Sequence, residues 1–441
     1  MTRNVLDAGV LDELREQATV TVFVPKEKEE YLRRLYGREG VRFVGLDLEP
    51  YIRGRRNTLF ARVAEVLLDT RTKRNHQRAY AFAGGSRFKY LAARMTMTLF
   101  GHPPLSWVAW PLFRSAELHL NNPDPFKEYF AERPEVAFVT DPFDERDVLF
   151  WKSAKRAGVR DVVLVRSWDN LVNKTLMRVR PSKLIVQNED MVEEAVRFHA
   201  IPRSRIKVGG VPQFEYYRRY TPTPREEFCK SMGIEPDKRI ILFSPAGRKY
   251  TDTDWQICEI LKQQIIHGEL PSDAHVLVRL HPQNYTDLSQ FVPDEHFTIE
   301  DPGVGLKTDR VKEVEFSRAT VNHLADELYH CALVINVISS IMIDAAVFDR
   351  PTLTVGFDGW EKDVPFLRSI AREAGEEWLQ VLFDTGVTPV ARNQVELAEL
   401  VREYLAHPEK DREVRARFVE RHCAGLTGDS AARIARMVLS A

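Results

Sequence analysis

Cysteine is scarce in this sequence, and its four cysteines are far apart. Cys229, Cys258, Cys331 and Cys423 form no CxxC pair and no other spacing that is typical of a metal site. This pattern argues against a zinc centre and against a framework of disulfide bonds. We therefore expect a protein of the reducing cytoplasm.

The sequence also lacks an excess of charge of one sign and an apolar N-terminal segment. Its formal net charge is −1, with 29% charged and 44% hydrophobic residues. This balance is typical of a globular protein, and it indicates neither a disordered chain nor one that coats nucleic acid. Residues 1–17 carry charges throughout, so they resemble neither a signal peptide nor a membrane anchor.

The longest uncharged run is the 19 residues 95–113. This run has the length of a membrane span, but it contains His102, Pro103, Pro104 and Pro111, which argue against a spanning helix. We therefore expect at most an interfacial segment.

The stretch before this run is strongly basic. Between Arg53 and Arg94, eleven Lys or Arg residues stand against only two acids, Glu65 and Asp69. Basic residues beside aromatic ones suit the surface of an anionic membrane. The aromatic residues of the run are Phe100, Trp107, Trp110 and Phe113. We therefore expect peripheral binding at the inner face of a membrane; a solvated basic face beside a buried core segment is the alternative.

The 441 residues exceed what one hydrophobic core usually organises, and they contain no repeat of fixed period. Runs of strand length alternate with helical patterns, which is the rhythm of βαβ units with parallel sheets. The expected strands are 19–24, 136–140, 162–165, 183–187, 206–208, 239–243, 275–280, 333–337 and 352–357. The expected helices are 5–17, 145–157, 189–198, 254–266, 323–330 and 340–348, with more after 394.

A polar stretch with three prolines, residues 217–238, separates two such series. We therefore predict an α/β protein of two Rossmann-like, doubly wound domains that face a common cleft. The N-terminal, acceptor-side domain is 1–217 and the C-terminal, donor-binding domain is 218–441. Because such domains normally open with a strand, a strand upstream of Met1 would complete the first one.

Three predicted strands of the second domain end in groups that suit phosphate. The residues concerned are Ser244, Gly247, Arg248, Arg279, His281, Ser339 and Ser340. They offer hydroxyls, cations, exposed backbone N–H groups at a tight turn, and the start of a predicted helix. Singly, each has a plain alternative, such as an N-cap role for Ser339. Because strand ends of one parallel sheet meet at one edge, we expect a joint phosphate site.

The motifs ILFSPAGR, LVRLHP and ALVINVISSIMIDAAVFDRPTLTV carry a family resemblance. They resemble the CDP-glycerol glycerophosphotransferase-like branch of the GT-B enzymes and, more loosely, bacterial GT-B sialyltransferases and Kdo transferases. The resemblance implies a CMP- or CDP-linked donor, with an HP motif and paired serines on its phosphates and an acid near its ribose. These positions fall on His281, Pro282, Ser339, Ser340 and Asp344.

The first half resembles the same branch through Trp168 and Lys174, which keep the spacing of a Trp-His-Gly motif with a following Lys. The histidine of that motif is Asp169 here, and the acidic residue two places before the paired serines is Val337. The likeness covers about residues 135–360. It therefore implies donor binding more directly than it implies glycerol phosphate as the transferred group.

Transfer to a hydroxyl needs a base for the acceptor proton and cations or N–H groups for the leaving phosphate. We expect Asp169 to be the base, with Asp141 or Asp144 as substitutes; capping a turn or helix is the alternative role for each. No DxD motif flanked by apolar residues is present and the histidines are dispersed, so we expect no metal and no cofactor besides the donor. The available cations are Arg248, Arg279 and Lys174.

The predicted function is transfer of a sugar or polyol phosphate from a CMP-, CDP- or UDP-linked donor to a surface-glycan or lipid-linked acceptor. One alternative is an isomerase like the UDP-N-acetylglucosamine 2-epimerases, whose nucleotide motif has glycines where this chain has Ser339 and Ser340. The other is a non-catalytic nucleotide-sugar-binding protein, which the absent histidine leaves open. Nothing in the composition suggests binding to nucleic acid.

Overall fold

The computed structural model describes residues 5–82, 84–121, 123–281, 284–301, 318–337, 339–360, 363–373 and 376–440. The chain divides into two compact units. Unit 1 is Met1–Tyr216 with Arg421–Ala441, and unit 2 is Tyr217–Glu420. The two boundaries fall inside helices α12 (Pro212–Arg219) and α20 (Arg412–His422). The end of the chain, which we expected in the second domain, is thus part of unit 1.

The described residues of unit 1 form six strands and a series of helices. Its strands are β1 (Val20–Pro25), β2 (Val41–Leu46), β3 (Val136–Val139), β4 (Arg160–Leu164), β5 (Lys183–Val186) and β6 (Ile206–Val208). Its helices are α1 (Val10–Arg15), η2 (Lys26–Lys28), α2 (Glu29–Tyr36), α3 (Glu49–Ile52), α4 (Arg55–Leu67), α5 (Arg71–Phe82), α6 (Arg87–Phe100), α7 (Leu105–Leu120), α8 (Lys127–Ala131), α9 (Glu145–Arg156), α10 (Asn170–Asn173), α11 (Glu189–His199), η3 (Arg203–Arg205), η5 (Ala424–Leu426) and α21 (Ser430–Leu439).

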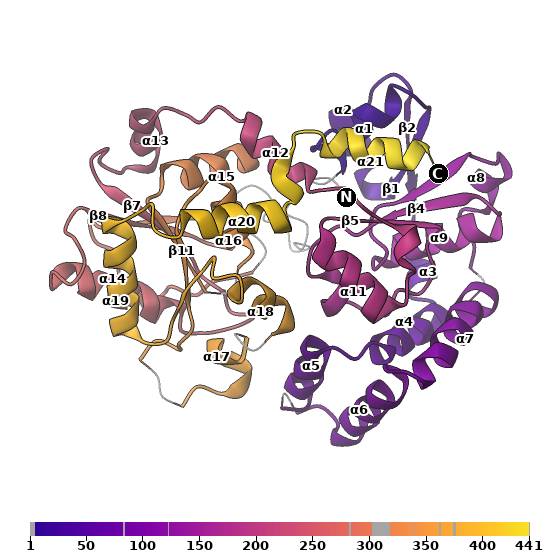
Figure 1. Cartoon of the computed structure of the whole chain (residues 1–441), viewed down its shortest axis with the longest axis horizontal. Coiled ribbons are helices and arrows are strands. Elements are labelled where there is room, and N and C mark those ends of the chain that lie inside the picture. Colours follow the sequence, from indigo (N-terminus) through magenta and orange to yellow (C-terminus); the bar gives the residue numbers. More distant parts are fainter. Residues whose placement is uncertain are drawn as a thin grey trace. The chain divides into compact units, whose positions relative to one another are not determined.

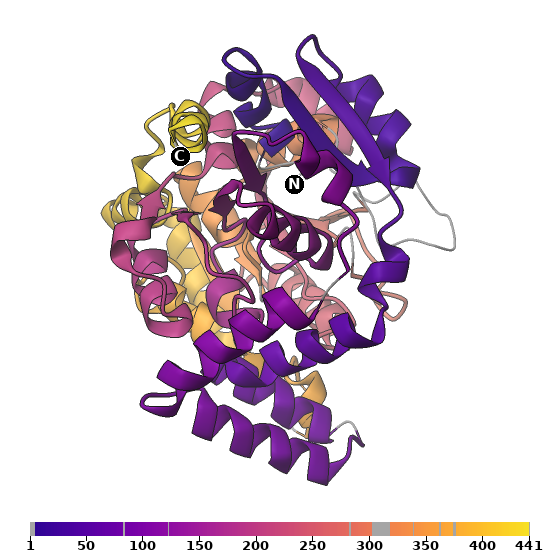
Figure 2. The ribbon, with the colours of Figure 1, turned by 90° about the vertical axis from the view of Figure 1, so that its right-hand side faces the viewer.

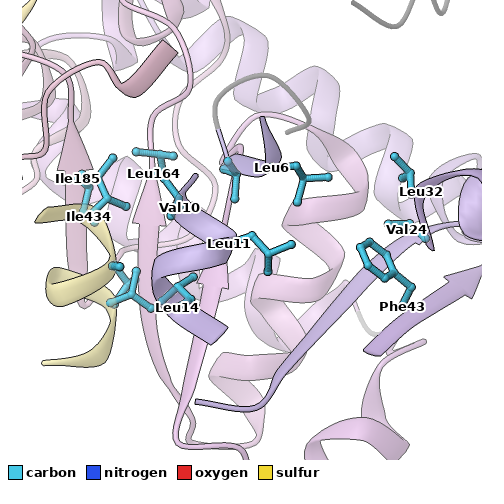
Figure 3. Packing of buried hydrophobic residues seen from close by; sticks show 14 residues of the cluster. Leu6, Val10, Leu11, Leu14, Val24, Leu32, Phe43, Leu164, Ile185 and Ile434 are labelled. Carbon is cyan, nitrogen blue, oxygen red and sulfur yellow. The ribbon is translucent and has the colours of Figure 1, made fainter. Parts of the chain in front are cut away.

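The strands of unit 1 form a parallel pair, β1-β2, and a parallel four-stranded sheet in the order β3-β4-β5-β6. After charged first residues, the central strands β4 and β5 continue in the buried apolar runs 162–164 and 184–186, as expected for strands covered on both faces. One core cluster joins α1, β4, β5 and α21 through Val10, Leu164, Ile185 and Ile434 (Figure 3). This packing explains why the last residues belong to unit 1.

The stretch that we expected to lie at a membrane surface forms four consecutive helices, α4 to α7. Figure 1 shows them gathered on one side of the sheets of unit 1, and in Figure 2 they lie along the lower edge of the picture. The inner faces of α4 and α7 share a core that includes Ala64, Leu67, Trp110 and Phe113. In the described part of the chain, no helix is long and apolar enough to cross a membrane.

Unit 2 contains one large sheet. Its strands are β7 (Arg239–Ser244), β8 (Ala274–Arg279), β9 (Phe297–Glu300), β10 (Leu333–Asn336), β11 (Thr352–Val355) and β12 (Val390–Ala391). Its helices are α13 (Arg225–Met232), α14 (Asp254–Ile266), α15 (Arg318–His330), α16 (Ile341–Val347), η4 (Phe366–Arg368), α17 (Ile370–Glu373), α18 (Glu377–Phe383) and α19 (Gln394–Ala406).

All neighbouring strands of this sheet are parallel, in the order β12-β11-β10-β7-β8-β9. Counted from β7, this is the doubly wound order of dinucleotide-binding domains, in which the winding reverses between the first and fourth strands. Helices α13, α15 and α16 share one core with β7 and β8, whereas α14 and α19 pack together (Figure 1). The prediction of two Rossmann-like α/β units is confirmed.

Candidate functional site

The three motifs of the second domain lie at the ends of adjacent strands, because β10, β7 and β8 are neighbours in the sheet. The winding reverses between β7 and β10, and ligands of open α/β sheets bind outside such a point. The backbone N–H of Val337, after β10, donates to the carbonyl of Ser244 at 3.3 Å. The ends of these two strands are therefore in direct contact.

The turn after β7 differs from our expectation. The backbone N–H groups of Ala246 and Gly247 do not face outward; they donate to the carboxylate of Asp254 at 3.0 and 2.7 Å. Burial raises the pKa of Asp254 to about 6, although these two hydrogen bonds oppose the shift. Gly247 has φ +82°, and a Cβ there would lie 2.5 Å from the amide nitrogen of Asn284. Gly247 therefore shapes the turn and does not present an N–H to a ligand.

The exposed cations at this edge are Arg248 and Lys249. The Arg248 side chain lies 3.8 Å from Asp252. Desolvation, and then the charge of Lys249, lower the pKa of His281, so its ring is neutral at pH 7. Lys249 was not singled out from the sequence, because nothing there shows that it lies near His281. Pro282, of the same motif, lies outside the described residues.

Arg279, which we expected to hold phosphate, is buried in an ion-pair cluster. Its Nη1 donates to Glu300 at 3.1 Å and to Glu327 at 2.5 Å. Burial raises the pKa of Glu327 well above its ordinary value. His323 completes the group, with its Nε2 at 2.6 Å from Glu300. The side chain of Arg279 therefore serves this cluster, which the sequence analysis did not anticipate because its members are far apart in the chain.

The paired serines lie where β10 gives way to α16. The Ser339 hydroxyl accepts the backbone N–H of Ile341 at 3.3 Å, and Ser340 is the exposed N-cap residue. Asp344, the expected ribose ligand, is buried, and its Oδ1 accepts the Tyr217 hydroxyl at 2.7 Å. Asp344 therefore has a partner within the protein, and its contact with a ribose remains a prediction.

The segment after β11 contacts the loop after β7. The Arg368 guanidinium donates to the backbone carbonyl of Arg248 and lies 3.3 Å from Asp252. The backbone N–H of Trp360 donates to Gln256 Oε1 at 3.1 Å. The loops that follow β7 and β11 are therefore tied together beyond the end of β10, which lies between these strands in the sheet.

The three candidate bases of unit 1 have different surroundings. Asp144 is the N-cap of α9, where its side chain accepts the N–H of Arg146 at 2.9 Å. Asp141 is buried, and its Oδ2 lies 3.2 Å from Arg166. Asp169 is half-buried; its Oδ1 accepts the Ser167 hydroxyl, and its Oδ2 accepts the Asn173 amide at 3.2 Å. Asp144 and Asp169 are both half-buried, and of these two Asp144 caps a helix with its side chain whereas Asp169 does not.

Lys174 follows α10 and is exposed. Lys73 of α5 lies near it and is buried. Burial lowers the pKa of Lys73, and the charge of Lys174 adds to this effect while Glu65 opposes it. The sequence analysis counted Lys73 only as part of a basic run. Its closeness to Lys174 depends on the packing of α5 against α10.

Comparison with known proteins identifies a family. The family described as CDP-glycerol:poly(glycerophosphate) glycerophosphotransferase matches residues 164–440, well over half of the chain. No curated protein matches the sequence.

Several solved structures are similar. A UDP-GlcNAc 2-epimerase from Methanocaldococcus jannaschii is 12% identical, with 74% of this chain and 82% of that chain covered and a TM-score of 0.48. One from Neisseria meningitidis is 12% identical, with 75% and 89% covered and a TM-score of 0.45. The wall teichoic acid polymerase TagF is 12% identical, with 77% and 98% covered and a TM-score of 0.40. On the strength of the family match, the chain belongs to the CDP-glycerol:poly(glycerophosphate) glycerophosphotransferase family.

Proposed function

We propose that this transferase moves a polyol phosphate or a sugar from a CDP- or CMP-linked donor to a hydroxyl of a surface-glycan or lipid-linked acceptor. The observation that supports this proposal is that β7, which ends at Ser244, and β10, which leads to Ser339 and Ser340, are adjacent strands between which the winding of the sheet of unit 2 reverses. Family membership favours a transferase over an epimerase.

For a CDP-linked polyol, the acceptor oxygen forms a bond to the outer phosphorus while the bond between that phosphorus and the bridging oxygen breaks. CMP leaves with the electron pair, and the acceptor proton goes to Asp169. The serine hydroxyls and His281 donate hydrogen bonds to the donor phosphates, and Arg248 and Lys249 supply positive charge beside them. We propose that this stabilisation of the leaving group needs no metal.

Asp169 suits the role of base because Ser167 and Asn173 orient its carboxylate. Asp169→Asn keeps the size and removes the basicity, so turnover should fall by about 10²–10⁴ while donor affinity survives. CMP release and calorimetric donor binding are the two measurements. Asp141→Asn is the matched comparison: if it abolishes turnover while Asp169→Asn is fully active, the base is Asp141.

Donor binding is tested with CDP-glycerol, CMP, UDP-GlcNAc and GDP-mannose by thermal shift. We expect CDP-glycerol and CMP to raise the midpoint, and His281→Ala to cripple turnover without loss of the fold. Donor binding with no CMP release toward any acceptor would indicate a non-catalytic binding protein. Interconversion of UDP-linked sugars would indicate the epimerase alternative.

We further propose that α6 and α7 dock on an anionic bilayer, where the acceptor would be anchored. Along α6, Phe88, Leu91 and Met95 recur at helical spacing and are 80%, 63% and 61% exposed. On α7, Trp107 and Leu112 are 70% and 65% exposed. Such a large exposed apolar face is rare on a monomeric soluble protein and is typical of an interaction site.

Two of the aromatic residues expected at the interface have another role. Trp110 and Phe113 are buried in the core between α4 and α7, whereas Phe100 and Trp107 are exposed. Arg74, which the basic count included, forms a two-pronged pair with buried Asp69 at 2.6 and 2.7 Å. Charge reversal at Arg74 would therefore damage the fold.

The docking test uses exposed basic residues beside the apolar face. We expect salt-sensitive sedimentation of the protein with phosphatidylglycerol vesicles, weakened by Arg87→Glu with Lys89→Glu and by Trp107→Ser. Lys127→Glu with Lys207→Glu, exposed residues on other elements of unit 1, is the matched control. If the wild-type protein stays in the supernatant at low ionic strength, the docking proposal fails and a soluble acceptor is favoured.

A further inference from the structure

We propose that Glu300, His323 and Glu327 bind one divalent transition-metal ion, with Zn²⁺ as the preferred metal. One ligand atom from each lies within 4.8 Å of the other two, and among the described residues this is the group that could hold a metal ion. Glu300 ends β9, and His323 and Glu327 are four residues apart on α15. This spacing puts both side chains of α15 on one face of the helix.

Arg279 occupies one oxygen of each of the two carboxylates and leaves the other oxygen on the side of His323. Its Nη1 donates to Oε2 of Glu300 and to Oε2 of Glu327. The two Oε1 atoms lie 2.6 and 3.7 Å from Nε2 of His323. Arg279 thus has the place of an outer partner that orients metal ligands.

Glu327 supplies a second observation that points to a ligand. Its side chain is fully buried, and its Oε1 has no hydrogen-bond partner in the described part of the chain. A buried carboxylate oxygen without a partner is unfavourable, whereas a cation between it, Glu300 and His323 would satisfy it.

The chemistry of the ligands selects the metal. One imidazole and two carboxylates suit Zn²⁺, which commonly keeps water at its fourth position in sites with three protein ligands. When both carboxylates are ionised, as metal ligands must be, their charges and that of Arg279 sum to −1, which favours a dication. The His323 side chain is 34% exposed, which gives an ion a way in from solvent. Bound metal would fix β9, an edge strand of the sheet, to α15.

The test measures metal directly, so it is independent of the proposed transfer reaction. Tag-free protein is stripped with a chelator and titrated with ZnCl₂, MnCl₂ and MgCl₂ by calorimetry, with elemental analysis after dialysis. We expect one Zn²⁺ per chain and a higher thermal midpoint. Glu327→Gln keeps the shape of the side chain and should weaken binding at least about 100-fold, since even outer partners of ligands contribute 10–100-fold.

His323→Gln should weaken binding to a similar degree. The matched control is His407→Gln, which removes an exposed histidine paired with Glu409 at 3.5 Å in the same unit and should leave binding unchanged. Circular dichroism and a cooperative thermal transition without metal verify that each variant is folded. If wild-type protein binds no metal in stoichiometric amount, or if both ligand variants bind like wild type, the group is an ion-pair cluster and the proposal is overturned.

Discussion

At the scale of single residues, Asp147 and Asp254 have equivalent roles in the two units. Each lies in the first turn of the helix after the first strand of its main sheet. Asp147 accepts the N–H groups of Thr140 and Asp141 at 3.0 and 2.8 Å, as Asp254 does with Ala246 and Gly247. Burial raises both pKa values to about 6. Both carboxyls therefore shape the loop that carries candidate site residues.

The raised pKa of Asp254 gives a prediction with a defined sign. The folded protein binds this proton more tightly than the unfolded chain does, so the stabilisation is complete below about pH 4 and is lost as the pH rises through about 6. Asp254→Asn does not titrate. The free energy of unfolding of Asp254→Asn should therefore lie further below that of the wild type at pH 5 than at pH 7. The gaps at the two pH values should differ by about 1 kcal/mol.

The measurement is urea unfolding of both proteins at the two pH values. Asp237→Asn is the control, because Asp237 is an exposed acid of the same unit. A gap between wild type and Asp254→Asn that is equal at both pH values would contradict the raised pKa.

At the scale of elements, α7 has two dissimilar faces. Its outer face carries exposed Trp107 and Leu112, and its inner face carries Glu117, which is fully buried. Glu117 accepts hydrogen bonds from Lys152 at 2.9 Å and from Arg178 at 2.8 and 3.1 Å. These ion pairs hold α7 against α9 and the loop before β5. The apolar outer face of α7 takes no part in them and is exposed.

Glu117→Gln should destabilise unit 1 strongly. The change leaves Lys152 buried without its carboxylate and removes one of the two acidic partners of Arg178, at a cost of about 3–5 kcal/mol. Thermal unfolding followed by circular dichroism measures the loss. Glu132→Gln, at an exposed position after α8, should change the midpoint little. A small effect at Glu117 would show that the network is easily rearranged.

At the scale of the whole molecule, the chain returns to unit 1 after it has completed unit 2. Ile434 of α21 is fully buried beside Ile185 of β5 and Val10 of α1 (Figure 3). Ile434→Ala should cost about 2–5 kcal/mol, because it removes buried apolar atoms from this cluster. Hydrogen exchange should therefore quicken in α1, β4 and β5, and remain unchanged in β7 and β10.

Val395→Ala on α19 is the control for Ile434→Ala, since Val395 is 60% exposed and belongs to unit 2. Unchanged exchange in α1 and β5 would mean that α21 contributes little to the core of unit 1. Faster exchange throughout unit 2 would mean that the two units are energetically coupled.

The alternation of apolar strands and helical patterns in the sequence was sufficient to predict the fold class. The expected strand 206–208 and helix 254–266 match β6 and α14. Strands β2, β9 and β12 were missed; β12 has only two residues and β9 alternates apolar with polar residues, so neither forms a clear apolar run. Helices α4 to α7 were also missed, because basic residues and an uncharged run obscured their helical periodicity.

The sequence by itself determined which side chains lie at the strand ends of unit 2, because a residue that follows a strand in the chain must lie at the end of that strand. Only the tertiary structure decided what those groups contact. The backbone N–H groups of the β7 turn bind Asp254, Arg279 binds Glu300 and Glu327, and α21 joins unit 1. Each of these outcomes depends on residues far apart in the chain that packing brings together, and no local pattern records such contacts.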